Sequence, residues 1–153
     1  MQARLKAIPL FALFLFAALN GCSTNDTAPN TTAEVGQSLY QQLGGADGVT
    51  RLANQWGANI AGNSTLNQIL DSVVIGEIQT GFTNDVMKAS GMVPGTTTTL
   101  ASALSGKGLN EMHINALSNT LREAGASLGI NPTVMSTAAS TVVEPAARSA
   151  AGM

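Results

Sequence analysis

Apolar residues recur at every third or fourth position from residue 37 to about residue 143, with polar residues between them. This is the period of an α-helix that buries one face. No segment shows the strict apolar–polar alternation of a half-buried β-strand. The pattern therefore predicts an all-α domain. The expected helical segments are 37–43, about 46–61, 66–70, 74–89, 100–105, 111–124 and 132–144.

The second predicted helix carries the clearest buried stripe. Its apolar side chains lie three and four positions apart and include Trp56, the largest side chain after residue 36. We therefore expect Trp56 in the core. Gly81 is the weak point of the 74–89 helix, because glycine destabilises a helix interior. The stripe consists of Val49, Leu52, Ala53, Trp56 and Ile60.

The last two predicted helices have the strongest boundary signals. Asn110 is a good N-cap for the first of them, and Gly125 is placed to end it in a left-handed conformation. Asn131 and Pro132 then supply an N-cap and a proline at the first helical position. We expect Pro145 to stop the last helix, leaving a tail of small residues.

The N-terminal residues have the pattern of an export signal. Arg4 and Lys6 precede a thirteen-residue apolar run, 7–19, which is shorter than the roughly 20 residues of a membrane-spanning helix. Residues 19–22 (LNGC) resemble the bacterial lipoprotein box, in which the chain is cut before the cysteine. We expect a lipoprotein signal peptide over 1–21, a lipidated flexible tether over 22–36 and one helical domain over 37–153.

Cys22, the single cysteine, is the expected lipidation site. In proteins with this box the cysteine carries several acyl chains such as palmitate, and two or more chains anchor a protein stably to a membrane. The alternative is a soluble secreted protein with an unrelated cysteine. Ser23, rather than Asp, follows Cys22, which by family habit implies the periplasmic face of the bacterial outer membrane. We therefore expect a lipid-anchored protein of the cell envelope.

The charge of the chain excludes some partners. Removing the leader takes Arg4 and Lys6 with it, so five basic residues face nine acidic ones and the formal charge is −4. Binding to nucleic acid is not expected at this charge. The acidic residues, Asp85 among them, form no pair with a histidine or a second carboxylate at a spacing that suggests acid–base chemistry, and we expect them to be solvated. No catalytic residue is identified, so enzymatic activity has very little support.

Two separated segments resemble the truncated haemoglobins of the group 1 type. Residues 38–45 (SLYQQLGG) are similar to the opening of that family, and residues 106–114 (GKGLNEMHI) are similar to its later stretch before a long helix. Residues 121–125 (LREAG), followed by Asn131 and Pro132, fit its last two helices. The resemblance implies a globin fold built around a haem pocket.

The resemblance also places the family's haem contacts on positions where this chain differs. The proximal histidine falls at Leu104, the distal tyrosine at Gly57, and the phenylalanine that packs on the porphyrin at Ile69 or Leu70. Leucine cannot donate to iron, so these substitutions imply that no cofactor is bound. His113, the only histidine, is the one imidazole that remains as an alternative haem ligand.

His113 also has a simpler interpretation as a residue in the first turn of a helix, because it lies three positions after the Asn110 N-cap. Methionine is a further possible iron ligand, but methionine at helical spacing is typical of core packing. We expect the packing role for this group. Its members are Met87, Met92, Met112 and Met135.

These residues leave three functional hypotheses open. The first is a haem-free binding or interaction module that contacts an envelope protein or an apolar ligand. The second is a haem-binding envelope globin that binds O₂ or another diatomic ligand, with His113 or an external ligand on the iron. The third is a structural envelope lipoprotein without a ligand. Fold alone does not decide among them.

Overall fold

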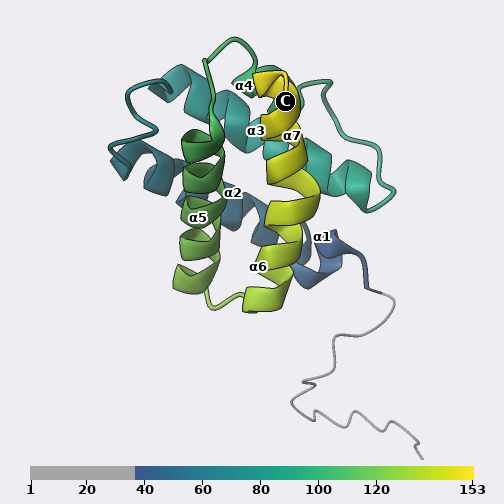
Figure 1. Cartoon of the computed structure of the whole chain (residues 1–153). Helices are drawn as coiled ribbons and strands as arrows, with labels where there is room; N and C mark the ends of the chain where they lie inside the picture. The colour runs from purple at the N-terminus through teal and green to yellow at the C-terminus, as the bar shows by residue number, and fades with distance from the viewer. Residues whose placement is uncertain (1–36) are drawn as a thin grey trace, which may run out of the picture. The chain divides into compact units, whose positions relative to one another are not determined.

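The computed structural model describes residues 37–153. The predicted signal peptide and tether, with Cys22, lie outside this part of the chain. Every regular element within the described residues is helical, so the all-α prediction is confirmed. None of these helices is both long and apolar enough to cross a membrane. In chain order the elements are α1 (Leu39–Gln42), α2 (Gly45–Gly62), α3 (Ser72–Ala89), α4 (Leu100–Leu104), α5 (Glu111–Ser127), α6 (Pro132–Ala138), the π-helical segment η1 (Ala139–Val143) and α7 (Glu144–Ala151) (Figure 1).

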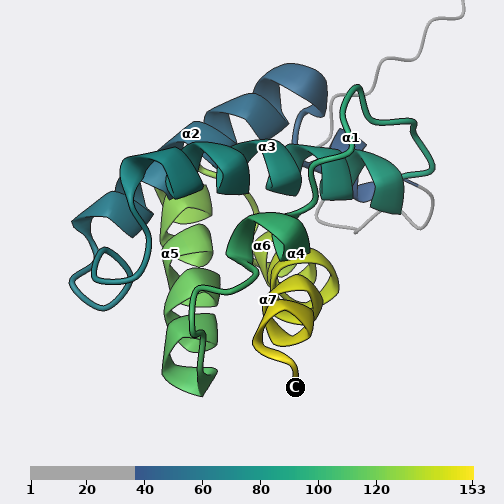
Figure 2. The ribbon, with the colours of Figure 1, turned by 90° about the horizontal axis from the view of Figure 1, so that it is seen from above.

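The helices form two crossed layers, best seen in Figure 2. α2 and α3 pack side by side, and they cross steeply over a second pair made of α5 and the continuous rod α6–η1–α7. The short helix α4 lies against both α3 and α7. The steep crossing differs from a four-helix bundle, in which the helices lie about 20° from parallel.

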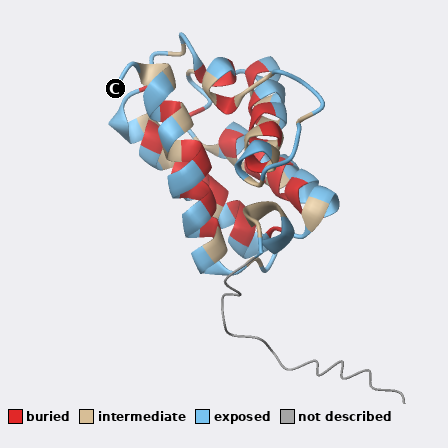
Figure 3. Cartoon of the chain, turned by 90° about the vertical axis from the view of Figure 1, so that its right-hand side faces the viewer, coloured by how far each residue is buried: buried red, intermediate tan, exposed pale blue. Residues whose placement is uncertain are grey.

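The core fills the space between the layers. Buried positions form stripes on the inward faces of the helices, as their period predicts (Figure 3). Trp56 is fully buried, which confirms the expectation from sequence. Its indole N–H donates to the Leu117 carbonyl oxygen and to the Thr120 hydroxyl, both at 3.1 Å. Phe82 of α3 packs edge-on against the indole with ring centroids 5.2 Å apart. These two large rings fill the interior between α2, α3 and α5.

The predicted N-caps of the last two helices are confirmed. The Asn110 side-chain oxygen accepts from the His113 backbone N–H at 3.1 Å, and the Asn131 side-chain oxygen accepts from the Thr133 N–H at 2.8 Å. Pro132 occupies the first turn of α6 as expected. Asparagine at these positions satisfies N–H groups that have no partner within the helix.

The predicted end of α5 is wrong. Gly125 lies inside the helix, and the glycine in the left-handed conformation is Gly129, with φ of +70°. A Cβ at position 125 would overlap the side chain of Met135. Gly125 is therefore explained by the close approach of α6 to α5, a contact between helices that the local sequence does not reveal.

The predicted stop at Pro145 is also wrong. The chain continues as α7, and the expected tail is helical with Ala147 buried in the core. Proline lacks the N–H that a regular helix interior needs, and the wider turn of η1 directly precedes it. Pro145 lies in the first turn of α7, directly after this wider turn, where the regular α-helical hydrogen-bond pattern is already interrupted.

The methionines and acidic residues divide between core and surface. Met135 is buried, as expected, whereas Met92 and Met112 are exposed and do not pack the core.

Glu111 and Glu144 are partly exposed but not simply solvated. They form ion pairs on the outer surface, Glu111 with Arg148 and Glu144 with Arg122.

Candidate functional site

Leu104, the position that the resemblance assigns to an iron-binding histidine, is the last residue of α4 and is fully buried. Its side chain belongs to the apolar core. A porphyrin bonded to iron from position 104 would have to lie against α4. α4 packs against both α3 and α7, and the spacing of α3 and α4 decides whether a ring fits between those two helices.

The backbones of α3 and α4 touch at Gly81. A Cβ added at this glycine would stand 2.5 Å from the Leu100 nitrogen and 2.6 Å and 2.7 Å from the Thr99 carbonyl carbon and oxygen. Only a residue without a side chain allows this approach. At this point the two helices leave no space for a flat ring, and Gly81, the predicted weak point of the helix, has a packing role.

Two polar side chains of α3 hold α4 and the segment before it. The Asp85 carboxylate accepts from the Leu100 backbone N–H at 2.8 Å, at the start of α4. The buried Asn84 amide donates to the Thr96 hydroxyl at 2.6 Å and to the Thr98 carbonyl at 2.8 Å. We call Gly81, Asn84 and Asp85 the α4 clamp. It is built entirely from one face of α3.

Asp85 is the one described group with a clearly shifted pKa. Burial raises the pKa of this carboxyl above its usual value, and the Leu100 N–H and the Lys88 ammonium oppose the shift. Asp85 is half-buried and its carboxylate is bonded to α4, so the expectation that it is solvated is wrong. Its burial follows from its hydrogen bond to α4, which lies fifteen residues further along the chain.

Gly57, at the family position of the distal tyrosine, is buried in α2. A Cβ there would collide with the amide of Gln79 and approach the Ile75 methyl group to 3.1 Å. The position therefore faces α3 at close range, and a side chain there would displace the Gln79 amide. Leu70 is buried and Ile69 half-buried against the core, in hydrogen-bonded turns that replace the predicted short helix.

His113 lies at the start of α5 and serves as part of a capping box. Its Nδ1 accepts from the Asn110 backbone N–H at 3.2 Å, while its own backbone N–H donates to the Asn110 side chain. The imidazole is half-buried at the helix end and takes no part in the α4 clamp. Within residues 37–153, no three His, Cys, Asp or Glu side chains gather in a way that would hold a metal ion.

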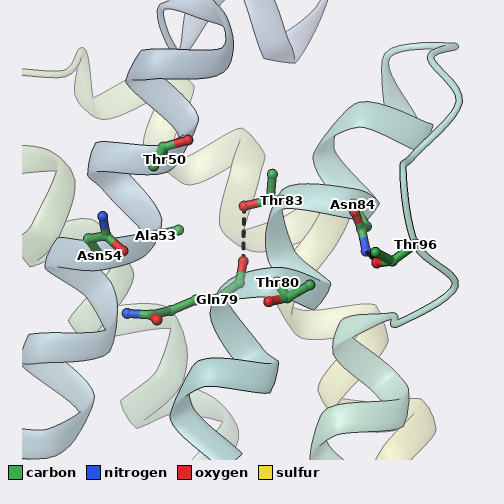
Figure 4. Close-up of a pocket in the computed structure, with 8 residues that line it drawn as sticks. All are labelled: Thr50, Ala53, Asn54, Gln79, Thr80, Thr83, Asn84 and Thr96. Carbon is green, nitrogen blue, oxygen red and sulfur yellow. Dashed lines mark hydrogen bonds between the residues drawn. The ribbon is translucent and has the colours of Figure 1, made fainter.

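A groove lined mainly by uncharged polar residues lies between α2 and α3, next to the α4 clamp (Figure 4). Its volume is about 290 Å³, and the segment before α4 contributes Thr96 to its lining. None of its lining side chains carries a charge. We call it the α2–α3 groove. It is lined by Thr50, Ala53, Asn54, Gln79, Thr80, Thr83, Asn84 and Thr96.

Sequence reasoning found some of these residues and missed others. Leu104, Gly57 and Leu70 are all buried, whereas His113 lies at the surface end of a helix. The α4 clamp and the groove were not predicted. The available signal was the glycine inside the α3 pattern, because a mid-helix glycine often marks a close approach of another backbone.

The comparisons with known proteins identify the fold. No family model matches the sequence, and no curated protein matches it. The structure is similar to the crystal structure of a mutant truncated haemoglobin from Tetrahymena pyriformis in its Fe(III) form, with a TM-score of 0.63 and 16% identity over 74% of this chain and 97% of that one. The domain has a truncated-globin-like fold, as the resemblance implied. An identity this low establishes the fold alone.

Proposed function

We propose that this chain is a membrane-anchored lipoprotein whose truncated-globin-like domain works without haem, as a binding or interaction module. The contact of α3 with α4 at Gly81 carries this proposal. A haem bonded from the α4 side would require these backbones to separate. Separation would break the hydrogen bonds that Asn84 and Asp85 make to the segment 96–100.

The chemistry of the interior supports the same conclusion. Leu104 offers iron no donor atom, so a porphyrin at this position would be held by apolar contact alone. Trp56 and Phe82 occupy the space between the helices with ring against ring. These features support a domain that works without haem, and the close-packed interior equally disfavours an apolar ligand inside the domain. Binding is therefore expected at the outer surface.

Haem content after expression tests this proposal. The full chain is produced in cells with ample haem and purified in detergent, and the haem bound per chain is measured. We expect no stoichiometric haem. The alternative function, a haem-binding globin for O₂ or a similar ligand, is favoured by the likeness to an Fe(III) truncated haemoglobin. A protein that purifies red, with a His113→Ala variant that does not, would establish that alternative with His113 as the iron ligand.

The anchor is proposed from residues 19–22 and has a separate test. Cys22→Ala should abolish labelling with a fatty acid such as palmitate and leave a soluble or unprocessed product. We expect the unaltered chain to fractionate with the outer membrane, in keeping with Ser23 after the cysteine. Labelling and membrane fractionation that persist in Cys22→Ala would contradict the lipoprotein proposal.

A further inference from the structure

We propose that the α2–α3 groove binds one neutral sugar unit of a carbohydrate. This rests on the proposed role as a binding module, but it requires neither the absence of haem nor the lipid anchor. The groove presents hydroxyl and amide groups from three segments that lie apart in the sequence, α2, α3 and the segment before α4 (Figure 4). Such groups form the hydrogen bonds that a sugar's hydroxyl and acetamido groups require.

Two amides in the groove are available to a ligand. Asn54 on α2 and Gln79 on α3 line it, and neither side chain hydrogen-bonds to another described residue. Gln79 extends toward α2, where the absence of a side chain at Gly57 lets its amide lie close to the α2 backbone. Each amide offers both a donor and an acceptor. Together they can bind neighbouring polar groups of one ring.

Hydrogen bonds within the protein hold four other lining side chains, those of Thr80, Thr83, Asn84 and Thr96. The Thr83 hydroxyl donates to the Gln79 carbonyl oxygen at 2.9 Å, and Thr80 donates to the Gly76 carbonyl at 3.0 Å, which leaves both hydroxyl oxygens able to accept. Asn84 fixes Thr96 through the 2.6 Å bond of the α4 clamp. A lining that is already ordered loses little conformational freedom on binding.

The lining also excludes other classes of ligand. A phosphate or carboxylate would be expected to meet a basic side chain, and none lines the groove. A peptide helix needs an apolar groove and a peptide strand needs an open sheet edge. Here Ala53 is the only apolar lining residue, and every regular element of residues 37–153 is helical.

The size of the groove sets the size of the ligand and its affinity. Its volume of about 290 Å³ lies just below the roughly 300–1,000 Å³ of small-molecule sites, which indicates a single ring. Because the groove is small and no aromatic ring lines it, the expected dissociation constant is roughly millimolar.

Nuclear magnetic resonance of the ¹⁵N-labelled full chain in detergent tests this proposal. The probes are chitotriose, which carries acetamido groups, and maltotriose, which carries hydroxyl groups alone. We expect at least one of them to shift the side-chain amide signals of Asn54 and Gln79 saturably. Asn54→Ala and Gln79→Met each remove one amide, and each should weaken binding about fivefold or more. Methionine keeps the length of the glutamine side chain against Gly57.

Asn115→Ala is the matched control, because Asn115 is an exposed asparagine on α5 outside the groove. It should bind the probe with unchanged affinity. The proposal is overturned if neither sugar gives saturable shifts at Asn54 and Gln79, or if both groove variants bind as tightly as the unaltered chain. Either result would leave the haem and lipid measurements unaffected, so the two proposals fail separately.

Discussion

Replacing Gly81 with alanine tests the close approach of α3 and α4. The new Cβ would stand 2.5–2.7 Å from backbone atoms of Thr99 and Leu100, closer than side-chain carbons come to backbone. α4 would therefore have to move away from α3, and the Asp85 hydrogen bond to Leu100 would be strained. Gly76 in the same helix is a matched control, because nothing lies within 4 Å of the position that its Cβ would take.

The two substitutions should change stability in opposite directions. Alanine is more favourable than glycine inside a helix by about 0.8–1 kcal/mol, so Gly76→Ala should raise the free energy of unfolding by about that amount. Gly81→Ala gains the same term, but overpacking costs about 1–3 kcal/mol. Loss of the Asp85 hydrogen bond costs about 1 kcal/mol more. We therefore expect Gly81→Ala to lower the free energy of unfolding by about 1–3 kcal/mol.

Urea unfolding followed by far-ultraviolet circular dichroism measures both effects. The comparison within one helix cancels the intrinsic preference for alanine and isolates the contact with α4. If Gly81→Ala stabilises the protein as much as Gly76→Ala does, α3 and α4 are not in backbone contact. The physical argument against a ring between them would then be lost.

Two further substitutions test the core and the clamp. Trp56→Ala should lower the free energy of unfolding by about 3–5 kcal/mol, because it removes a fully buried indole together with its hydrogen bonds, and a loss below about 1 kcal/mol would mean that Trp56 is exposed. Asp85→Asn keeps an acceptor for the Leu100 N–H without a buried charge. Because the folded pKa of Asp85 is raised, the wild type loses stability as the pH rises from 3.8 through that pKa. The variant should therefore be at least as stable at pH 7, with its advantage shrinking toward pH 4. An advantage that is constant with pH would contradict the burial of this carboxylate.

Local signals predicted the helices and several of their ends. The period of the apolar residues located α2, α3 and α5, because each helix buries a single stripe. Asn110 and Asn131 marked helix starts correctly, since a cap bonds to the backbone two or three residues away. Such interactions lie within a few residues of one another in the sequence and can be inferred from it.

Contacts between helices explain the errors. Gly125 has the local features of a helix end, but its position is set by Met135 on α6. Pro145 has the local features of a helix stop, but the helix continues through η1 into α7, where Ala147 is buried. In both cases packing between elements outweighed the local preference of one residue.

The candidate site likewise contains residues that the sequence could locate and pairings of residues that it could not. Leu104 and Gly57, which the resemblance assigns to the haem contacts, are both buried. The role of Asp85 depends on Leu100, and that of Gln79 depends on the space above Gly57. Neither pairing has a sequence pattern, because each joins residues that only the packed helices bring together.

Titration of the purified full chain with haemin is the sharpest test of a domain that works without haem. We expect no sharp Soret band for the unaltered chain. A Leu104→His variant should bind haemin better, because it restores a nitrogen donor on the α4 side. A sharp, stoichiometric band in the unaltered chain that disappears in His113→Ala would contradict the haem-free proposal, since it would show a bound haem held by the surface histidine of α5.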